Sequence, residues 1–125
     1  MGVAKPDRIK SKLDFAAIYA GRASLRDHLL TVCWRRSDRE RPRLGLSVGR
    51  RHGGAVERNR MKRRLREIFR RDQDEVPEHV DLILVPRALP EPPDLTALRD
   101  SFRRLMRRLA KRIDAAPEPT AGDLR

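Results

Sequence analysis

The stretch GRRHGGAVERNRMKRRLREIFRR, residues 49–71, places two adjacent glycines directly before a segment with the spacing of an amphipathic helix. The apolar side chains of this segment fall on one side of a helical wheel: Met61, Leu65, Ile68 and Phe69. We therefore predict a helix over residues 55–71, which begins after the turn at Gly53 and Gly54. Its apolar stripe is expected to lie in the core of the protein.

The same segment is strongly basic, with eight Lys and Arg residues and one acid between Arg58 and Arg71. Because the core determines where the apolar stripe points, the cations are predicted to project together from the other side. Like charges at helical spacing, such as Arg58, Lys62 and Arg66, destabilise an isolated helix, so stability alone does not select this pattern. The alternatives are a solvated face and a surface that holds phosphates, and the near absence of acids favours phosphates.

Other ligands of a basic helix fit this sequence less well. A membrane-surface helix exposes Trp, Phe or Leu opposite its charges, whereas here that side is predicted to be core. A helix that reads double-stranded DNA places Asn or Gln among its arginines to contact base edges. The whole chain has only two amide side chains, Asn59 and Gln73. This composition favours recognition of backbone and shape, which is the usual mode for folded RNA.

The overall composition supports a polyanionic partner. The 125 residues include 30 Lys and Arg against 18 Asp and Glu, which gives a formal net charge of +12. An evenly spread basic surface is the alternative to a nucleic-acid interface. A single cysteine, Cys33, cannot form an internal disulfide and is interpreted as a small core residue. No apolar run approaches the roughly 20 residues of a membrane span, and no secretory signal is recognisable, so we expect a cytoplasmic protein.

Working outward from the basic helix, we predict five further elements. A helix over residues 12–20 follows Ser11 as its cap, and strands are predicted at 28–35, 44–49 and 80–86. A last helix begins after Asp94 and carries an apolar face as far as Ile113. Residues 1–113 are expected to form one domain of α+β class, in which helices cover at least one face of a small sheet. Residues 114–125 have the composition of a disordered tail.

One face of the second predicted strand is nearly bare. Leu44, Leu46 and Val48 point one way, while Gly45, Ser47 and Gly49 point the other way. Such a face is either the place where a helix packs closely or the floor of a groove open to a flexible ligand.

The first predicted helix is apolar on both sides. Phe15, Ile18 and Tyr19 share one side, and Leu13 with three alanines forms the other.

The sequence offers no convincing catalytic or metal site. A nuclease needs convergent carboxylates or histidines, but His28, His52 and His79 are scattered without metal-ligand spacing. Asp72, Asp74 and Glu75 cluster at the expected end of the basic helix, where solvated acids are common. We therefore predict no catalytic residue and no metal ligand in the chain. The rival functions to consider are a protein-only nuclease, which this lack of a catalytic cluster disfavours, and a ribosomal or other structural RNA-binding protein.

The run AVERNRMKRRLR, residues 55–66, resembles the signature of the bacterial ribonuclease P protein subunit, whose hallmark is an Arg-Asn-Arg helix. Three other stretches resemble the same family. LGLSVGRRHGGA is similar to its strand and turn, KLDFAAIYAGR to its first helix, and VDLILVPR to its last strand. The likeness extends from about Arg8 to Ile113.

The resemblance implies a single two-layer α+β domain with three helices and a four-stranded sheet. The implied order is helix, strand, strand, strand, helix, strand, helix, with a left-handed strand–helix–strand crossover around the Arg-Asn-Arg helix, against the usual rule. Only three strands are recognisable in the sequence. The fourth is expected as a short piece within the loop at residues 37–43.

The resemblance also implies a function. The chain would be the protein subunit of a ribonucleoprotein endoribonuclease that removes the 5′ leader from precursor tRNA, with cleavage performed by the RNA subunit and its Mg²⁺. The implied partners are the catalytic RNA and precursor tRNA, and no protein partner is evident. By position, the RNA-subunit-binding residues are Arg58, Asn59, Arg60, Lys62, Arg63 and Arg66. The corresponding leader-binding residues are Lys12, Phe15, Tyr19, Ser47, Arg50 and Arg51.

Two departures from the family pattern affect the leader site. Tyr19 stands where a phenylalanine is expected, which keeps a ring for stacking. In the first strand, the family's aromatic positions hold residues that include His28 and Leu29, so an additional contact with the leader is not predicted there. Trp34 is interpreted as a core residue.

Overall fold

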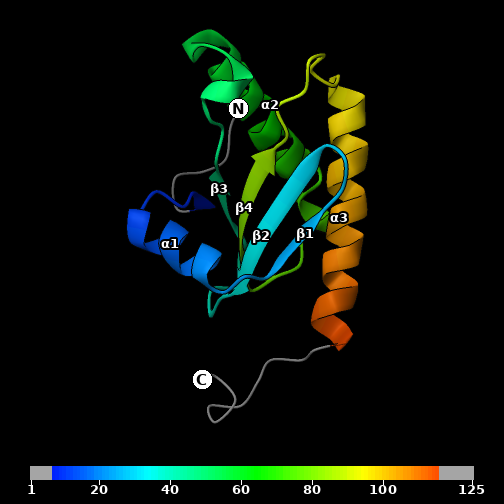
Figure 1. Ribbon diagram of the computed structural model, residues 1–125. Coiled ribbons are helices and arrows are strands. Elements are labelled where there is room, and N and C mark those ends of the chain that lie inside the picture. The colour runs from blue at the N-terminus through cyan, green and yellow to red at the C-terminus, as the bar shows by residue number, and fades with distance from the viewer. Residues whose placement is uncertain (1–6, 116–125) are drawn as a thin grey trace.

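Four strands form one mixed sheet in the spatial order β1-β2-β4-β3 (Figure 1). The structure is a computed structural model, and it describes residues 7–115. The strands are β1 (Ser24–Arg26), β2 (Leu30–Arg36), β3 (Arg43–Leu46) and β4 (Val80–Pro86). The helices are α1 (Lys12–Ala20), α2 (Ala55–Arg71) and α3 (Leu95–Ala115), with short 3₁₀ turns η2 (Arg50–His52) and η3 (Gln73–Glu75). The predicted class, element order and four-stranded sheet are confirmed.

The fourth strand is not where the sequence predicted it. Residues 37–43 form a loop that reaches β3 only at Arg43, whereas the additional strand is β1, which pairs antiparallel with β2. The carboxylate of Asp27 closes this hairpin by accepting the backbone N–H groups of Leu29 and Leu30, at 2.8 and 3.0 Å. The prediction was wrong because three residues with one buried side chain, Leu25, are too short to show alternation.

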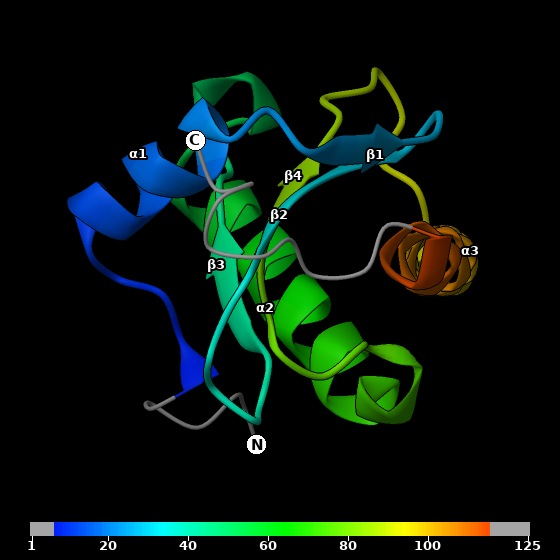
Figure 2. The same cartoon turned by 90° about the horizontal axis from the view of Figure 1, so that it is seen from below.

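The crossover from β3 through α2 to β4 is left-handed, as the family resemblance implied. Strands β3 and β4 are parallel neighbours. Helix α2 lies behind the sheet in the view of Figure 1, and β4 lies to the right of β3. Figure 2 shows α1 on one face of the sheet and α2 on the other, with α3 beside α2. The sheet and the α2–α3 layer form the two main layers, and α1 packs on the opposite face.

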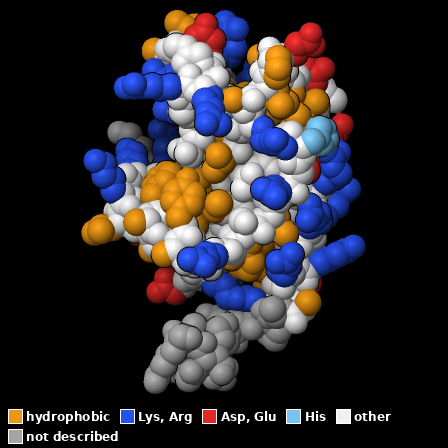
Figure 3. All heavy atoms as spheres, viewed as in Figure 1, with side chains coloured by type: hydrophobic (Ala, Val, Ile, Leu, Met, Phe, Trp, Pro, Cys, Tyr) orange, Lys and Arg blue, Asp and Glu red, His pale blue; other side chains and the backbone are white. Residues whose placement is uncertain are grey.

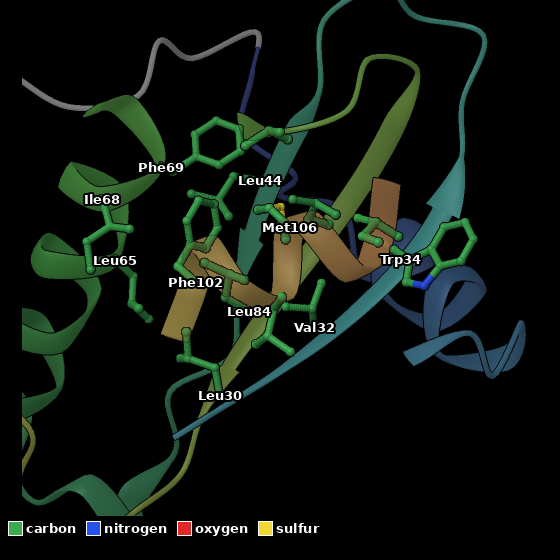
Figure 4. Packing of buried hydrophobic residues seen from close by; sticks show 14 of the residues in the cluster. Leu30, Val32, Trp34, Leu44, Leu65, Ile68, Phe69, Leu84, Phe102 and Met106 are labelled. Carbon is green, nitrogen blue, oxygen red and sulfur yellow. The ribbon is translucent and has the colours of Figure 1, made fainter. Parts of the chain in front are cut away.

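The main core fills the space between the sheet and the α2–α3 layer (Figure 4). Alternate residues of β2, namely Leu30, Val32 and Trp34, face this layer. All four residues of the predicted stripe on α2 are buried against them, as is Phe102 from α3. Trp34 is therefore a core residue, as predicted. Burial of one such large apolar side chain contributes about 2 to 3 kcal/mol to folding.

Helix α1 packs on the other face through a small second cluster. Ile18 is fully buried beside Ile9 and Ile83, with Phe15 and Cys33 partly buried around them. The hydroxyl of Ser11 accepts the backbone N–H of Leu13 at 3.1 Å, so the predicted cap is confirmed. The other apolar side of α1, which includes Leu13, is exposed to solvent.

A network of charged side chains ties α1 to the sheet. Asp81 on β4 is buried, and it accepts hydrogen bonds from Arg43 at 2.8 and 2.9 Å and from Arg35 at 3.0 Å. The same two arginines reach Asp14 on α1, at 3.7 and 3.1 Å. Burial alone would raise the pKa of Asp81, but the bonds from Arg43 and Arg35 outweigh burial and lower it. The network therefore holds α1 at one position over the sheet.

Ion pairs also hold α3 against its neighbours. Asp94 caps the helix by accepting the N–H of Ala97 at 2.8 Å, as predicted. Arg99 forms a two-pronged pair with the buried Asp72 at 2.8 Å, and Arg103 reaches Glu75 at 3.3 Å. These two acids were expected to be solvated, but the fold brings α3 arginines to them. Helix α3 includes residues 114 and 115 of the predicted tail, and the rest of that tail lies outside the described residues.

Candidate RNA interface

A glycine turn sets the start of the basic helix. Gly53 has a φ of 109°, a left-handed backbone conformation that residues with a side chain rarely adopt. A Cβ atom at Gly53 would also lie 3.1 Å from the Cβ of Glu57. Gly54 then occupies the cap position of α2. The two glycines therefore allow a tight turn between η2 and α2.

Ion pairing divides the cations of α2 into two groups. Near the end of the helix, Glu67 accepts hydrogen bonds from Arg70 and Arg71, and these bonds, chiefly that from Arg70, hold the pKa of Glu67 at about 2. The cations of residues 58–66, here called the basic segment of α2, form no ion pair within residues 7–115. Among the described residues, the side chains of Arg58 and Arg64 donate hydrogen bonds only to backbone oxygens, those of Gly54 at 3.4 Å and Pro93 at 3.5 Å. The basic segment is therefore available to an external anion.

The basic segment points in more than one direction. Asn59, Arg60 and Arg63 are exposed on the outer side of α2. Lys62 and Arg66 instead point past the β3 edge toward α1, where they line a hollow of about 200 Å³ with Phe15. Burial lowers the pKa of Arg66, and the nearby positive charges of Arg8 and Arg63 lower it further. An anion bound in this hollow, here called the Phe15 hollow, would relieve that repulsion.

Phe15 and Tyr19 present their rings side by side over the sheet. Their centroids are 6.3 Å apart and the rings are tilted by 54°. The ring of Phe15 lies directly on Gly45, where an added Cβ would approach its Cζ to 2.8 Å. Close packing of a helix, rather than an open groove floor, is therefore the reason for the glycine at position 45. Tyr19 is 42% exposed, so its ring remains accessible.

Just beyond the end of β3, on the side of the sheet that carries α1, the surface is open. Ser47 and Arg51 line a hollow of about 360 Å³ together with Thr31, Gly49, His52, Val85, Pro86, Arg87 and Ala88. We call it the Ser47 hollow. A Cβ at Gly49 would meet no atom within 4 Å, so no helix packs closely on the chain at this position. The predicted leader residues Lys12 and Arg50 are exposed at the beginnings of α1 and η2.

Figure 3 shows this face of the molecule, with an exposed apolar patch over α1 and many Lys and Arg side chains around it.

The structure also adds residues that sequence reasoning missed. The N-terminal segment pairs with β3 through the N–H of Ile9 and the oxygen of Leu44, at 2.9 Å, which brings Arg8 and Lys10 into the Phe15 hollow. No local sequence signal predicts this pairing. Thr31 could have been identified, because it alternates away from the core on β2.

The comparisons with known proteins agree with this geometry. A family model described as Ribonuclease P matches residues 3–110. This chain belongs to the ribonuclease P protein family. Membership makes it a protein component of a tRNA-processing ribonucleoprotein, for which an RNA subunit is the implied partner.

Individual relatives in the ribonuclease P protein family cover most of the chain. The ribonuclease P protein component of Thermotoga maritima is 32% identical over 107 residues, which span 82% of this chain and 92% of the relative. That of Oleidesulfovibrio alaskensis is 38% identical over 96 residues, 75% of this chain and 77% of the relative. The solved Thermotoga maritima RNase P protein superposes with a TM-score of 0.75 over 81% of this chain and 96% of that one, at 32% identity. The Staphylococcus aureus RNase P protein gives 0.74 over 84% and 95%, at 28% identity.

Two further observations concern only the described part of the chain. Between residues 7 and 115, no helix is long and apolar enough to cross a membrane. Over the same residues, no group of three or more His, Cys, Asp or Glu side chains is placed to hold a metal ion.

Proposed function

We propose that this ribonuclease P protein binds the catalytic RNA subunit through α2 and holds the 5′ leader of precursor tRNA against α1 and β3. In this way it promotes endonucleolytic removal of the leader by the RNA. The observation that carries the proposal is the contrast in ion pairing. Arg35 and Arg43 on the sheet and Arg99 and Arg103 on α3 are paired with acids. Within residues 7–115 the basic segment of α2 forms no ion pair, and it adjoins the Phe15 hollow.

The RNA subunit would dock on the exposed side of α2. The residues concerned are Arg58, Asn59, Arg60, Lys62, Arg63 and Arg66. Arginine forks bind phosphate oxygens in pairs, and such contacts set position without reading sequence. Because the apolar stripe of α2 is buried, the fold fixes which side of the helix presents these residues before RNA arrives.

The leader would lie along β3 from the Phe15 hollow to the Ser47 hollow, a path we call the cleft. Phe15 and Tyr19 would stack on bases without demanding a sequence, each stack contributing roughly 1 to 3 kcal/mol. Ser47 and Gly49 leave room for the strand, and Lys12, Arg50 and Arg51 would neutralise its phosphates. Lys62 and Arg66 line both the α2 surface and the Phe15 hollow, so the two RNA partners would meet there.

The protein would act by bridging two polyanions. The catalytic RNA and the precursor repel each other, and the cations of α2 and the cleft would offset that repulsion. Mg²⁺ held by the RNA would supply the hydrolytic chemistry, and no side chain of the protein would take part in it. Mature tRNA lacks the leader, so product would bind more weakly than substrate and leave. We expect this complex in the cytoplasm.

The test is cleavage of a leader-bearing precursor tRNA at low magnesium by the protein alone, the RNA subunit alone and both together. Cleavage by the mixture only is the expected result. If adding the protein gives no gain, a structural RNA-binding role replaces the proposal. Cleavage by the protein alone would instead indicate a nuclease.

The replacement Tyr19→Ala should weaken binding of precursor tRNA to the holoenzyme by about 5- to 100-fold, because one stacking ring is lost. Affinity for mature tRNA should be unchanged, since no leader is present. Tyr19→Phe keeps the ring and serves as the control. The measurement is the Kd of each RNA, and equal losses for precursor and mature tRNA would place Tyr19 outside the leader site.

A further inference from the structure

A third pocket lies between η2, the first turns of α2 and the linker at residues 87–94. Its volume is about 410 Å³. One wall is apolar and is formed by Met61, Leu89, Pro92 and Pro93. Guanidinium groups supply most of the polar lining, from Arg51, Arg60, Arg64 and Arg87. We call it the terminal pocket.

The charge in the terminal pocket is largely uncompensated. Within residues 7–115, the side chains of Arg51, Arg60 and Arg87 have no ion pair or hydrogen bond, and Arg64 contacts only the Pro93 oxygen. Two acids, Glu57 and Asp94, also line the pocket, and Asp94 is engaged as the cap of α3. Four cations against two carboxylates leave an excess of positive charge, which attracts an anion.

The shape and chemistry together indicate a nucleotide. A free phosphate would use the guanidinium forks but not the apolar wall, whereas an apolar ligand would desolvate the forks without compensation. A nucleotide satisfies both, because its base packs on flat apolar or guanidinium surfaces while its phosphate binds the forks. The pocket size is within the range of ordinary small-molecule sites, about 300 to 1,000 Å³.

The terminal pocket is adjacent to the cleft. It shares Arg51, His52, Arg87 and Ala88 with the Ser47 hollow. The Nε2 of His52 lies 2.9 Å from the Pro86 oxygen, and because a carbonyl only accepts, Nε2 must carry the hydrogen. The ring of His52 is thus held at the boundary between the two spaces. A strand that passes Phe15 and then Ser47 would reach the terminal pocket next.

We propose that the terminal pocket binds one unstacked nucleotide of the single-stranded leader, at the end of the cleft remote from Phe15. The inference rests on the proposed function, which places the leader in the cleft. It adds a subsite and new residues to that function, since Met61, Arg64, Arg87 and Pro92 belong to neither predicted group of RNA-binding residues.

The test compares Pro92→Glu with Pro90→Glu in the assembled holoenzyme. Both prolines are exposed in the same linker, but of the two only Pro92 lines the terminal pocket. Pro92→Glu therefore adds a negative charge inside the pocket, and Pro90→Glu adds the same charge outside it. The Kd is measured for mature tRNA and for precursors whose leaders are lengthened one nucleotide at a time. For the wild-type protein, affinity should increase again when the leader becomes long enough to reach the pocket. Pro92→Glu should lose that last increase, about 5- to 10-fold, whereas Pro90→Glu should keep it.

Three outcomes separate the possibilities. If both variants match the wild-type protein at every leader length, the subsite is overturned. If Pro92→Glu weakens the binding of mature tRNA or of the RNA subunit as much as it weakens the binding of precursor tRNA, the pocket contacts another part of the complex and the leader assignment is wrong. If the wild-type holoenzyme does not prefer precursor over mature tRNA, the proposed function itself fails.

Unfolding curves of both variants check the fold. A photoreactive nucleotide at the leader position that gives the last increase in affinity should crosslink to residues 87–94 of the wild-type protein.

Discussion

Replacement of Asp81 by Ala should lower the free energy of unfolding by about 3 to 5 kcal/mol, the range found when one partner of a buried ion pair is removed. The side chain of Asp81 is only 1% exposed, and it accepts hydrogen bonds from Arg35 and Arg43. Without it, two guanidinium groups would remain next to the sheet, and Asp14 would be their only acidic partner in the part of the chain that the structure describes. Denaturant unfolding of the wild-type protein and the variant measures the difference.

Asp14→Ala is the matched control, because it removes a carboxylate that contacts the same two arginines but is 34% exposed. We expect a loss of about 1 kcal/mol or less there. The pH dependence gives a second check. Folding lowers the pKa of Asp81, so its contribution is present above the unfolded pKa of about 3.9 and is lost as pH falls through the folded value. Similar small losses in both variants would contradict a structural role for the buried carboxylate.

Raising the salt concentration from about 50 to about 200 mM should weaken binding of the protein to the RNA subunit by about 250- to 1,000-fold. If roughly six phosphates are neutralised, the log–log slope is about −4 to −5 on the coefficients for single and double strands. The six predicted RNA-subunit residues include five cations that form no ion pair within residues 7–115. Because these cations do not first have to break internal ion pairs, the release of counterions from the RNA sets the full salt dependence of Kd. The measurement is Kd over a salt series.

Arg63→Ala should reduce that slope by about 1 and leave the unfolding curve unchanged, since Arg63 is exposed and lies off the apolar stripe. Arg112→Ala is the control, because Arg112 is an exposed arginine on α3, away from the proposed interface. A slope near zero for the wild-type protein would refute the electrostatic account. Equal effects of Arg63→Ala and Arg112→Ala would show that total charge, rather than the α2 surface, governs binding.

Several parts of the fold were predictable because they depend on local pattern. The bounds of α1 and α2 agree with the predicted helices at 12–20 and 55–71, since a cap or glycine turn precedes a sustained helical period in both. Strand β4 also agrees, because its apolar run ends at Pro86. Strand β2 begins at Leu30 rather than at residue 28, and β3 ends at Leu46 rather than at 49, which reflects the usual uncertainty of strand ends.

By itself, the sequence determined the class of the fold, the basic face of α2, the family and the residues to consider for RNA binding. Only the tertiary structure decided which of those residues lie together. It placed Phe15 on Gly45, brought Lys62 and Arg66 into the Phe15 hollow, and set the Ser47 hollow next to the terminal pocket. It also decided which arginines are paired, because their acids come from other elements, such as Asp81 for Arg35 and Asp72 for Arg99. Periodicity reports the environment of a residue relative to its own helix or strand, whereas pairing and pockets depend on contacts between segments far apart in the chain.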